Sequence, residues 1–122
     1  MFTKTKLALF SVVALGAIAV ATQIQASPLS GSWCRASTVY AGNYQNYTEY
    51  FRAGERAVIE LQGDGDTDLD VYVYDEYGNL IVSDTAWGDY AAVSFVPSWS
   101  GRFTIKVVNR GHVYNNYTIC MY

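Results

Sequence analysis

The sequence predicts an all-β fold, an antiparallel β-sandwich of about eight short strands. After Ser27 no stretch keeps the period of about 3.6 residues that an amphipathic helix needs. Short runs of β-branched and aromatic residues alternate instead with clusters of glycine, proline, asparagine and aspartate. Within several runs, apolar and polar residues alternate, which is typical of sheets that bury one face only.

The alternation places the strands and assigns their faces. In the fourth expected strand Leu69, Val71 and Val73 point to one side. Tyr72 and Tyr74 must then point to the other side, because successive side chains of a strand alternate. In chain order the expected strands are Ser32–Ala36, Gln45–Phe51, Ala57–Gln62, Leu69–Asp75, Leu80–Ser83, Ala91–Val96, Arg102–Asn109 and Val113–Met121.

A turn cluster follows most of these strands. Each cluster supplies glycine, proline or a short polar residue that tolerates turn dihedral angles. No second domain, linker or internal repeat interrupts the series. The clusters are Ala53–Glu55, Gly63–Asp66, Glu76–Asn79, Trp87–Asp89, Pro97–Gly101 and Arg110–His112.

The N-terminus predicts a signal peptide over residues 1–26. Lys4 and Lys6 precede the apolar stretch Leu7–Ala21, and small residues follow, which is the order that a signal peptidase substrate needs. We expect cleavage before Ser27, with a cut after Ala21 as the alternative. Fifteen residues in a helix cover only about 22 Å, less than the ~30 Å of a hydrocarbon core. An uncleaved membrane anchor is the competing interpretation.

The remaining residues 27–122 are enough for one small domain with one core. They carry six Arg or Lys against eleven Asp or Glu, a net charge of −5. A domain with this balance and no evident basic stripe argues against nucleic acid or an anionic membrane as a partner. We expect an exported monomer, periplasmic or extracellular, with no membrane span after cleavage.

Two cysteines remain in this domain, Cys34 and Cys120, near its two ends. Export would place them where disulfides persist. A bond between them would join the first strand to the last and stabilise the fold by about 4–5 kcal/mol in the chain-entropy model. Two free thiols and a metal site are the alternatives, although a metal site would lack the usual paired spacing of ligands.

An acidic run is the sharpest local feature, with Asp64, Asp66, Asp68 and Asp70 at every second position. Calcium prefers six to eight oxygen ligands, so these four are candidate calcium ligands. The helix–loop–helix calcium pattern fails here, because it needs glycine where the chain has Leu69. In the alternative interpretation the carboxylates cap turns and accept backbone hydrogen bonds.

The run Asp66–Asp75, D-T-D-L-D-V-Y-V-Y-D, is followed by the segments Gly78–Leu80, Gly101–Asn109 and Tyr117–Ile119. Together they resemble the bacterial pre-peptidase C-terminal domain family, over roughly Phe51–Tyr122. The resemblance implies a β-sandwich of jelly-roll type that accompanies secreted peptidases without being catalytic. It also implies roles in secretion or in substrate or matrix binding, sometimes with calcium. A cysteine pair is not a hallmark of that family.

The expected strand faces put Tyr72 and Tyr74 on the outside, beside the acids Asp68 and Asp70. Aromatic rings on a sheet could stack on sugars or dock a peptide, and with carboxylates beside them would suit polyhydroxylated or basic polymers. Cross-strand packing of the rings is the alternative. We therefore expect a non-catalytic accessory or binding module for a glycan or a protein.

Catalysis finds little support in the residue pattern. His112 is the single histidine and lies in an expected turn, and no nucleophile-elbow motif is present. A small hydrolase would have to be built on this residue or on a pair of carboxylates. The main competing function is a structural protein of the cell surface or matrix, without a specific small ligand.

Overall fold

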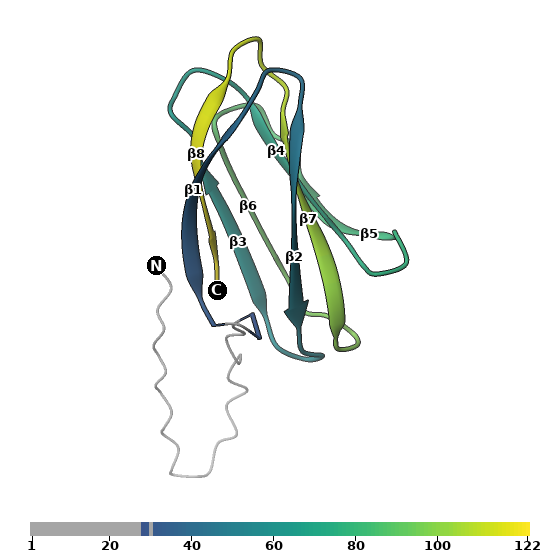
Figure 1. The fold of residues 1–122 in the computed structure, drawn as a ribbon. Helices are drawn as coiled ribbons and strands as arrows, with labels where there is room; N and C mark the ends of the chain where they lie inside the picture. Colours follow the sequence, from purple (N-terminus) through teal and green to yellow (C-terminus); the bar gives the residue numbers. More distant parts are fainter. Residues whose placement is uncertain (1–27, 30) are drawn as a thin grey trace, which may run out of the picture.

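The computed structural model describes residues 28–29 and 31–122, which form eight strands in two four-stranded antiparallel sheets (Figure 1). The sheets pack face to face, so the prediction of an antiparallel β-sandwich is confirmed. The strands are β1 (Trp33–Val39), β2 (Tyr44–Phe51), β3 (Ala57–Gln62), β4 (Leu69–Tyr74), β5 (Leu80–Asp84), β6 (Tyr90–Phe95), β7 (Gly101–Asn109) and β8 (Asn115–Met121).

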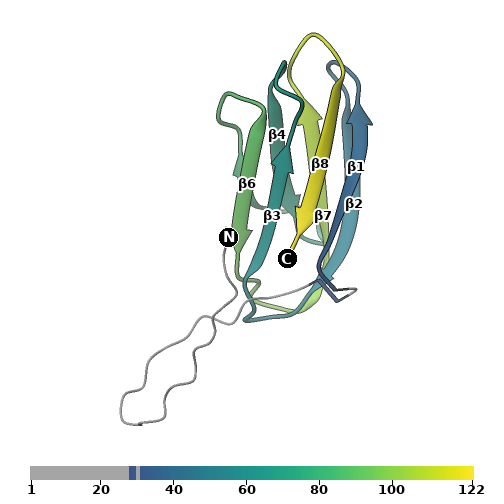
Figure 2. The same ribbon diagram turned by 90° about the vertical axis from the view of Figure 1, so that its left-hand side faces the viewer.

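The chain passes repeatedly between the two sheets. One sheet has the order β1–β8–β3–β6, which Figure 2 shows face-on, and the other has the order β2–β7–β4–β5. Only the connection from β4 to β5 stays within a sheet. Successive strands run in opposite directions, so every second loop lies at the same end of the sandwich. The loops at the upper end in Figure 1 are β1–β2, β3–β4, β5–β6 and β7–β8.

The core lies between the sheets and follows the period of two in the sequence. Leu69, Val71 and Val73 of β4 are fully buried, as are Ile105 and Val107 of β7, which pairs with β4. A register slip of one residue would turn these side chains out to solvent, so the burial of the apolar face fixes the pairing. The expected inward and outward faces of these strands are confirmed.

The first and last strands differ from their expected bounds. β1 runs three residues beyond Ala36, to Val39, and β8 begins at Asn115 instead of Val113. Both changes follow from the pairing of β1 with β8. Val39, the last residue of β1, pairs with Asn115, the first residue of β8. Pairing with β8 extends β1 through Ser37, Thr38 and Val39, beyond the strand that the sequence predicts.

The predicted disulfide between Cys34 and Cys120 is present. The two residues face each other in the β1–β8 ladder, with their Cα atoms 4.1 Å apart. The bond lies on the outward side of its sheet, since the neighbouring Ile119 and Met121 are fully buried. It joins the first strand to the last, as expected.

Two buried asparagines hold the upper loops together. The side chain of Asn109 donates to the backbone carbonyls of Val39 and Val113, at 3.1 and 2.8 Å, and its Oδ1 accepts from Thr67 Oγ1 and the Gly111 N–H. Three of the four upper loops thus meet at this one side chain, which is fully buried. Asn115, also fully buried, donates to the carboxylate of Asp89 in the fourth.

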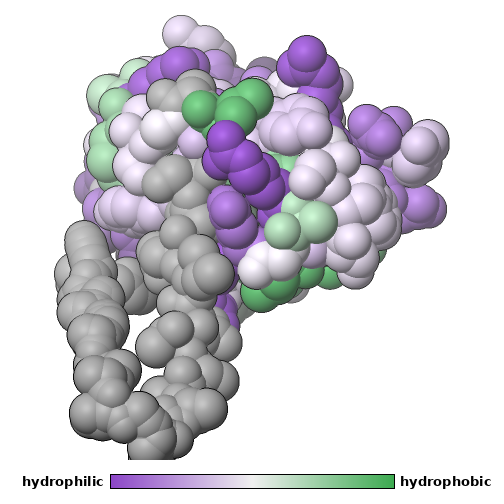
Figure 3. All heavy atoms as spheres, turned by 90° about the horizontal axis from the view of Figure 1, so that it is seen from below, coloured by the Kyte–Doolittle hydropathy of each residue, from purple (hydrophilic) through white to green (hydrophobic). Residues whose placement is uncertain are grey.

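The predicted signal peptide, residues 1–26, lies outside the described residues. In the part of the chain that the structure does describe, no helix is long and apolar enough to cross a membrane. Viewed from its lower end, the described surface shows small hydrophobic patches separated by hydrophilic residues (Figure 3).

Candidate functional site

Two aspartates of the acidic run form a surface pair in the β3–β4 loop. Asp64 and Asp66 are both exposed. The backbone N–H of Asn116 donates to Asp64 Oδ2 at 2.9 Å, and this bond lowers the pKa of Asp64. A hydrogen bond shared with Asp64 raises the pKa of Asp66. The hydrogen bond between the two carboxylates thus moves the pKa of Asp66 up and that of Asp64 down.

The other two aspartates are buried, Asp68 at 7% and Asp70 at 4% exposure. Asp68 Oδ1 accepts a hydrogen bond from the N–H of Gly88 at 2.9 Å, which ties the end of the β3–β4 loop to the β5–β6 loop. Asp70 Oδ2 pairs with Arg110 Nε at 3.1 Å. Burial raises the pKa of Asp70, and the hydrogen bond from Arg110 opposes that shift. Both buried carboxylates hold parts of the domain together.

Within residues 28–29 and 31–122 no group of three or more His, Cys, Asp or Glu side chains is placed to hold a metal ion. Asp64 and Asp68 accept hydrogen bonds from backbone N–H groups, which fits the turn-capping interpretation, whereas Asp70 accepts from the side chains of Arg110 and Tyr72. Calcium binding by Asp64, Asp66, Asp68 and Asp70 stays a prediction, and a calcium titration is its direct check.

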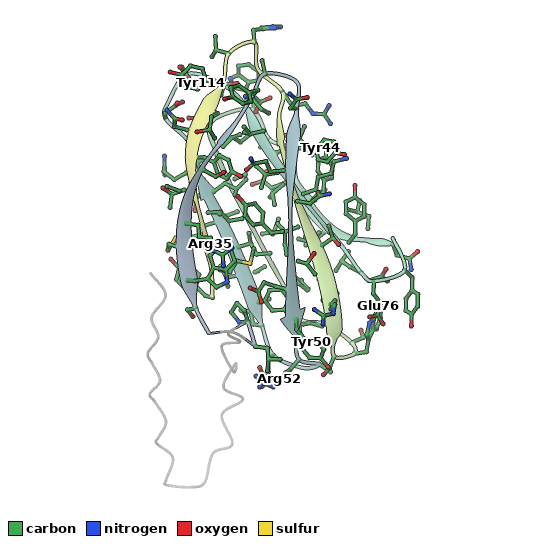
Figure 4. All side chains as sticks on the ribbon, in the orientation of Figure 1. Arg35, Tyr44, Tyr50, Arg52, Glu76 and Tyr114 are labelled. Atoms are coloured by element: carbon green, nitrogen blue, oxygen red, sulfur yellow. A yellow bond between two sulfur atoms is a disulfide. The ribbon has the colours of Figure 1, made fainter. Side chains whose placement is uncertain are left out.

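The outward surface of the β2–β7–β4–β5 sheet gathers tyrosines from two strands, β2 and β4, and we call it the tyrosine face. Its position follows from the alternation along β7, where Phe103, Ile105 and Val107 point into the core. Figure 4 shows Tyr44 and Tyr50 near the two ends of β2. The face consists of Tyr44, Asn46, Thr48 and Tyr50 from β2, Arg102, Thr104, Lys106 and Val108 from β7, Asp70, Tyr72 and Tyr74 from β4, and Arg110 just after β7.

Tyr72 and Tyr74 lie side by side on this face and are half-buried. Their rings are stacked, with centroids 6.4 Å apart and planes 18° apart. Arg110 Nη2 donates to the Tyr72 hydroxyl at 2.9 Å, so the ring is held at its polar end as well as by its neighbour. The orientation of the two rings is therefore set before any ligand arrives.

Three cations lie along β7 on the same face, Arg102, Lys106 and Arg110, at intervals of four residues. Intervals of four keep them on one side and about 13 Å apart in an extended strand. Lys106 Nζ lies 4.4 Å from the centroid of the Tyr44 ring, a cation–π contact. Of these three cations, Arg110 alone forms an ion pair with a carboxylate of the described residues, that of Asp70.

The structure corrects two expectations about this face. Carboxylates were expected to be exposed beside the rings, but Asp68 and Asp70 are buried and bonded within the protein. A basic stripe was not expected, because the net charge of the domain is negative. The spacing of Arg102, Lys106 and Arg110 was visible in the sequence, but only the strand assignment puts these cations beside tyrosines.

The other residues considered for function lie elsewhere. His112 is exposed in the β7–β8 loop at the upper end. Trp87, in the β5–β6 loop, is 86% exposed at that end, whereas Tyr77 is 76% exposed in the β4–β5 turn at the opposite end. The disulfide of Cys34 lies on the other sheet. The tyrosine face is therefore the candidate binding site.

Neither a protein-family model nor a curated protein matches this chain. The resemblance to the pre-peptidase C-terminal domain family accordingly stays an expectation.

Proposed function

We propose that this chain is an exported, non-catalytic binding module, and that the tyrosine face binds a glycan polymer. The observation that carries the proposal is the stacked pair of Tyr72 and Tyr74 on an outward sheet surface, with the hydroxyl of Tyr72 fixed by Arg110. Tyrosine offers a flat apolar ring together with a polar end, a combination suited to a sugar, which also has an apolar face and hydroxyl groups.

The polar residues between the rings support the same ligand class. Asn46, Thr48 and Thr104 project outward from β2 and β7, and Thr48 pairs directly with Thr104. Their amide and hydroxyl groups can both donate and accept hydrogen bonds, as sugar hydroxyls can. The surface runs along whole strands, which fits an extended polymer better than a compact small molecule.

Export and the non-catalytic role are part of the proposal. The bond between Cys34 and Cys120 is of the kind that persists in oxidising compartments. The basic, apolar and small segments of the N-terminus have the order of a signal peptide. The resemblance to the pre-peptidase C-terminal domain family agrees with an exported accessory domain that leaves catalysis to other proteins.

A structural role at the cell surface is the second candidate, and the reinforcement of the fold favours it. The disulfide ties edge strand β1 to β8, and buried Asn109 joins three loops. These features stabilise a domain whatever its function. The two candidates differ in what happens when exposed rings are removed from the tyrosine face.

Removing both rings, by Tyr72→Ala with Tyr74→Ala, should weaken glycan binding about tenfold or more while the fold is retained. The double variant lacks the two stacked rings that would contact the ligand, but every core side chain is unchanged. The matched control removes two exposed rings elsewhere, by Tyr40→Ala with Tyr77→Ala. Binding isotherms and thermal melts of both double variants check the prediction. A third variant, Ile105→Ala, shows how early the protein melts when its core is damaged, since this change should destabilise the fold by about 2–5 kcal/mol.

If the Tyr72 and Tyr74 double variant melts as early as Ile105→Ala, the rings are packing residues and the face loses its claim to function. If it retains the fold and the full affinity of the parent protein for every glycan, the binding proposal is wrong. That result would favour the second candidate, a structural role at the cell surface.

A further inference from the structure

We propose that the ligand of the tyrosine face is a polyuronate, a polysaccharide that carries a carboxylate on its sugar units. This inference rests on the proposed function and adds the chemical class of the glycan. Three features of the face carry it: the sign of its charge, the arrangement of its cations along one strand, and the way in which Arg110 already binds a carboxylate beside a hydroxyl.

The tyrosine face is positive in an otherwise acidic domain. Arg102, Lys106 and Arg110 oppose the carboxylates of Asp70 and of the adjacent Asp68, so the face has a net charge of +1. Residues 27–122 as a whole have −5, which leaves −6 for the rest of the domain. An anionic polymer is attracted to this face and repelled by the remainder of the surface, so the charge also selects where the polymer lies.

The cations form a line. Arg102 and Lys106 project from β7, a central strand with β2 on one side and β4 on the other, and Arg110 follows directly after its end, so the three cations run along the middle of the face. Arg102 lies opposite Tyr50 on β2, and Lys106 lies opposite Tyr72 on β4. Arg102 and Lys106 thus each lie level with a ring, and the three cations span about 26 Å at ~3.3 Å per residue. A polymer that carries an anionic group on each flat sugar ring matches this pairing of charge and ring.

Arg110 shows which anion the face accommodates. Its Nε donates to a carboxylate oxygen of Asp70, and its Nη2 donates to the hydroxyl of Tyr72. A uronate unit carries the same two groups, a carboxylate and neighbouring hydroxyls. Arg102 and Lys106 form no ion pair among the described residues, and Arg102 is exposed. These two cations can therefore receive the carboxylates of a ligand as Arg110 receives that of Asp70.

Lys106 keeps its capacity to bind an anion while it contacts Tyr44. The ammonium lies over the ring face, and the ring takes up none of its three N–H donors in a hydrogen bond to oxygen. The contact places the charge above the surface, where a carboxylate can reach it. The neutral Thr104 and Asn46 nearby favour a polymer rich in hydroxyl groups over a nucleic acid.

The test measures binding of the purified disulfide-bonded protein to polygalacturonate, its methyl ester, dextran sulfate, dextran and single-stranded DNA. Lys106→Gln with Arg102→Gln should weaken polygalacturonate binding on the order of tenfold. The control, Arg35→Gln with Arg56→Gln, makes the same charge change off the face, on β1 and beside Ser94 of β6, and should alter binding less than about twofold. Raising the salt concentration should weaken polygalacturonate binding by the parent protein more steeply than binding by the Lys106 and Arg102 double variant.

Each outcome decides a different statement. Tighter binding of polygalacturonate than of its methyl ester, lost in the face variant only, supports the polyuronate assignment. Equal binding of the ester or of dextran, still dependent on Tyr72 and Tyr74, overturns the assignment and keeps the proposed function. Tighter binding of dextran sulfate or of single-stranded DNA overturns the choice of a carboxylated glycan. Absence of binding to every polymer overturns both the assignment and the proposed function.

Discussion

Replacing Cys34 and Cys120 together by alanine is expected to lower the free energy of unfolding by about 3–5 kcal/mol. The bond closes a loop over a sequence separation of 86 residues, and in the chain-entropy model such a loop restricts the unfolded chain by about 4–5 kcal/mol. The total stability of a small domain is about 5–15 kcal/mol, so the loss is a large share of it.

The position of the bond adds to its effect. β1 is an edge strand and pairs with β8 alone, so without the bond it is held by one ladder and its inward side chains. Urea unfolding of the parent protein and the double variant, each with and without reductant, measures the difference. Reductant should destabilise the parent protein and leave the variant unchanged. A difference below about 1 kcal/mol would contradict the account of how the termini are held.

The second large effect is expected from Asn109→Ala, which should destabilise the fold by about 2–4 kcal/mol. The amide of Asn109 donates to the carbonyls of Val39 and Val113, and its oxygen accepts from Thr67 and Gly111. Alanine leaves these groups without partners, in a buried place at Val39 and in partly buried places at the others, and a buried unsatisfied group costs about 1–3 kcal/mol. Not all four losses add, because water can reach some of the groups once the loops separate.

The matched control is Asn116→Ala, which removes an exposed amide whose oxygen accepts one hydrogen bond, from Thr38. It should cost less than about 1 kcal/mol. Denaturant unfolding compares the two variants, and hydrogen exchange shows whether the upper loops open first in Asn109→Ala. Equal stabilities of the two variants would mean that Asn109 does not hold the loops together.

The sequence was sufficient for the strands and their faces, because each depends on local alternation. Leu69, Val71 and Val73 could be assigned to the core without knowing what they pack against. The order of strands in the sheets could not be predicted in this way. Pairs such as Val39 with Asn115 are distant in the chain, and they extend β1 beyond its local pattern.

The disulfide could also be predicted, because an exported domain with two cysteines has only one pair to form. The partners of the aspartates could not. Asp68 binds the N–H of Gly88, and Asp70 binds Arg110, contacts over 20 and 40 residues that only the folded chain creates. The tyrosine face was predicted through Tyr72 and Tyr74, but its positive charge needed the assignment of β7 beside β4.

The central claim is that the outward surface of the β2–β7–β4–β5 sheet is where the protein binds its ligand. The most direct test follows backbone amide chemical shifts of the isotope-labelled protein during titration with polygalacturonate oligomers. We predict that the largest changes fall in β2, β7 and β4, around Tyr44, Lys106 and Tyr72. Changes confined to the upper loops or to the β1–β8–β3–β6 sheet would contradict the claim.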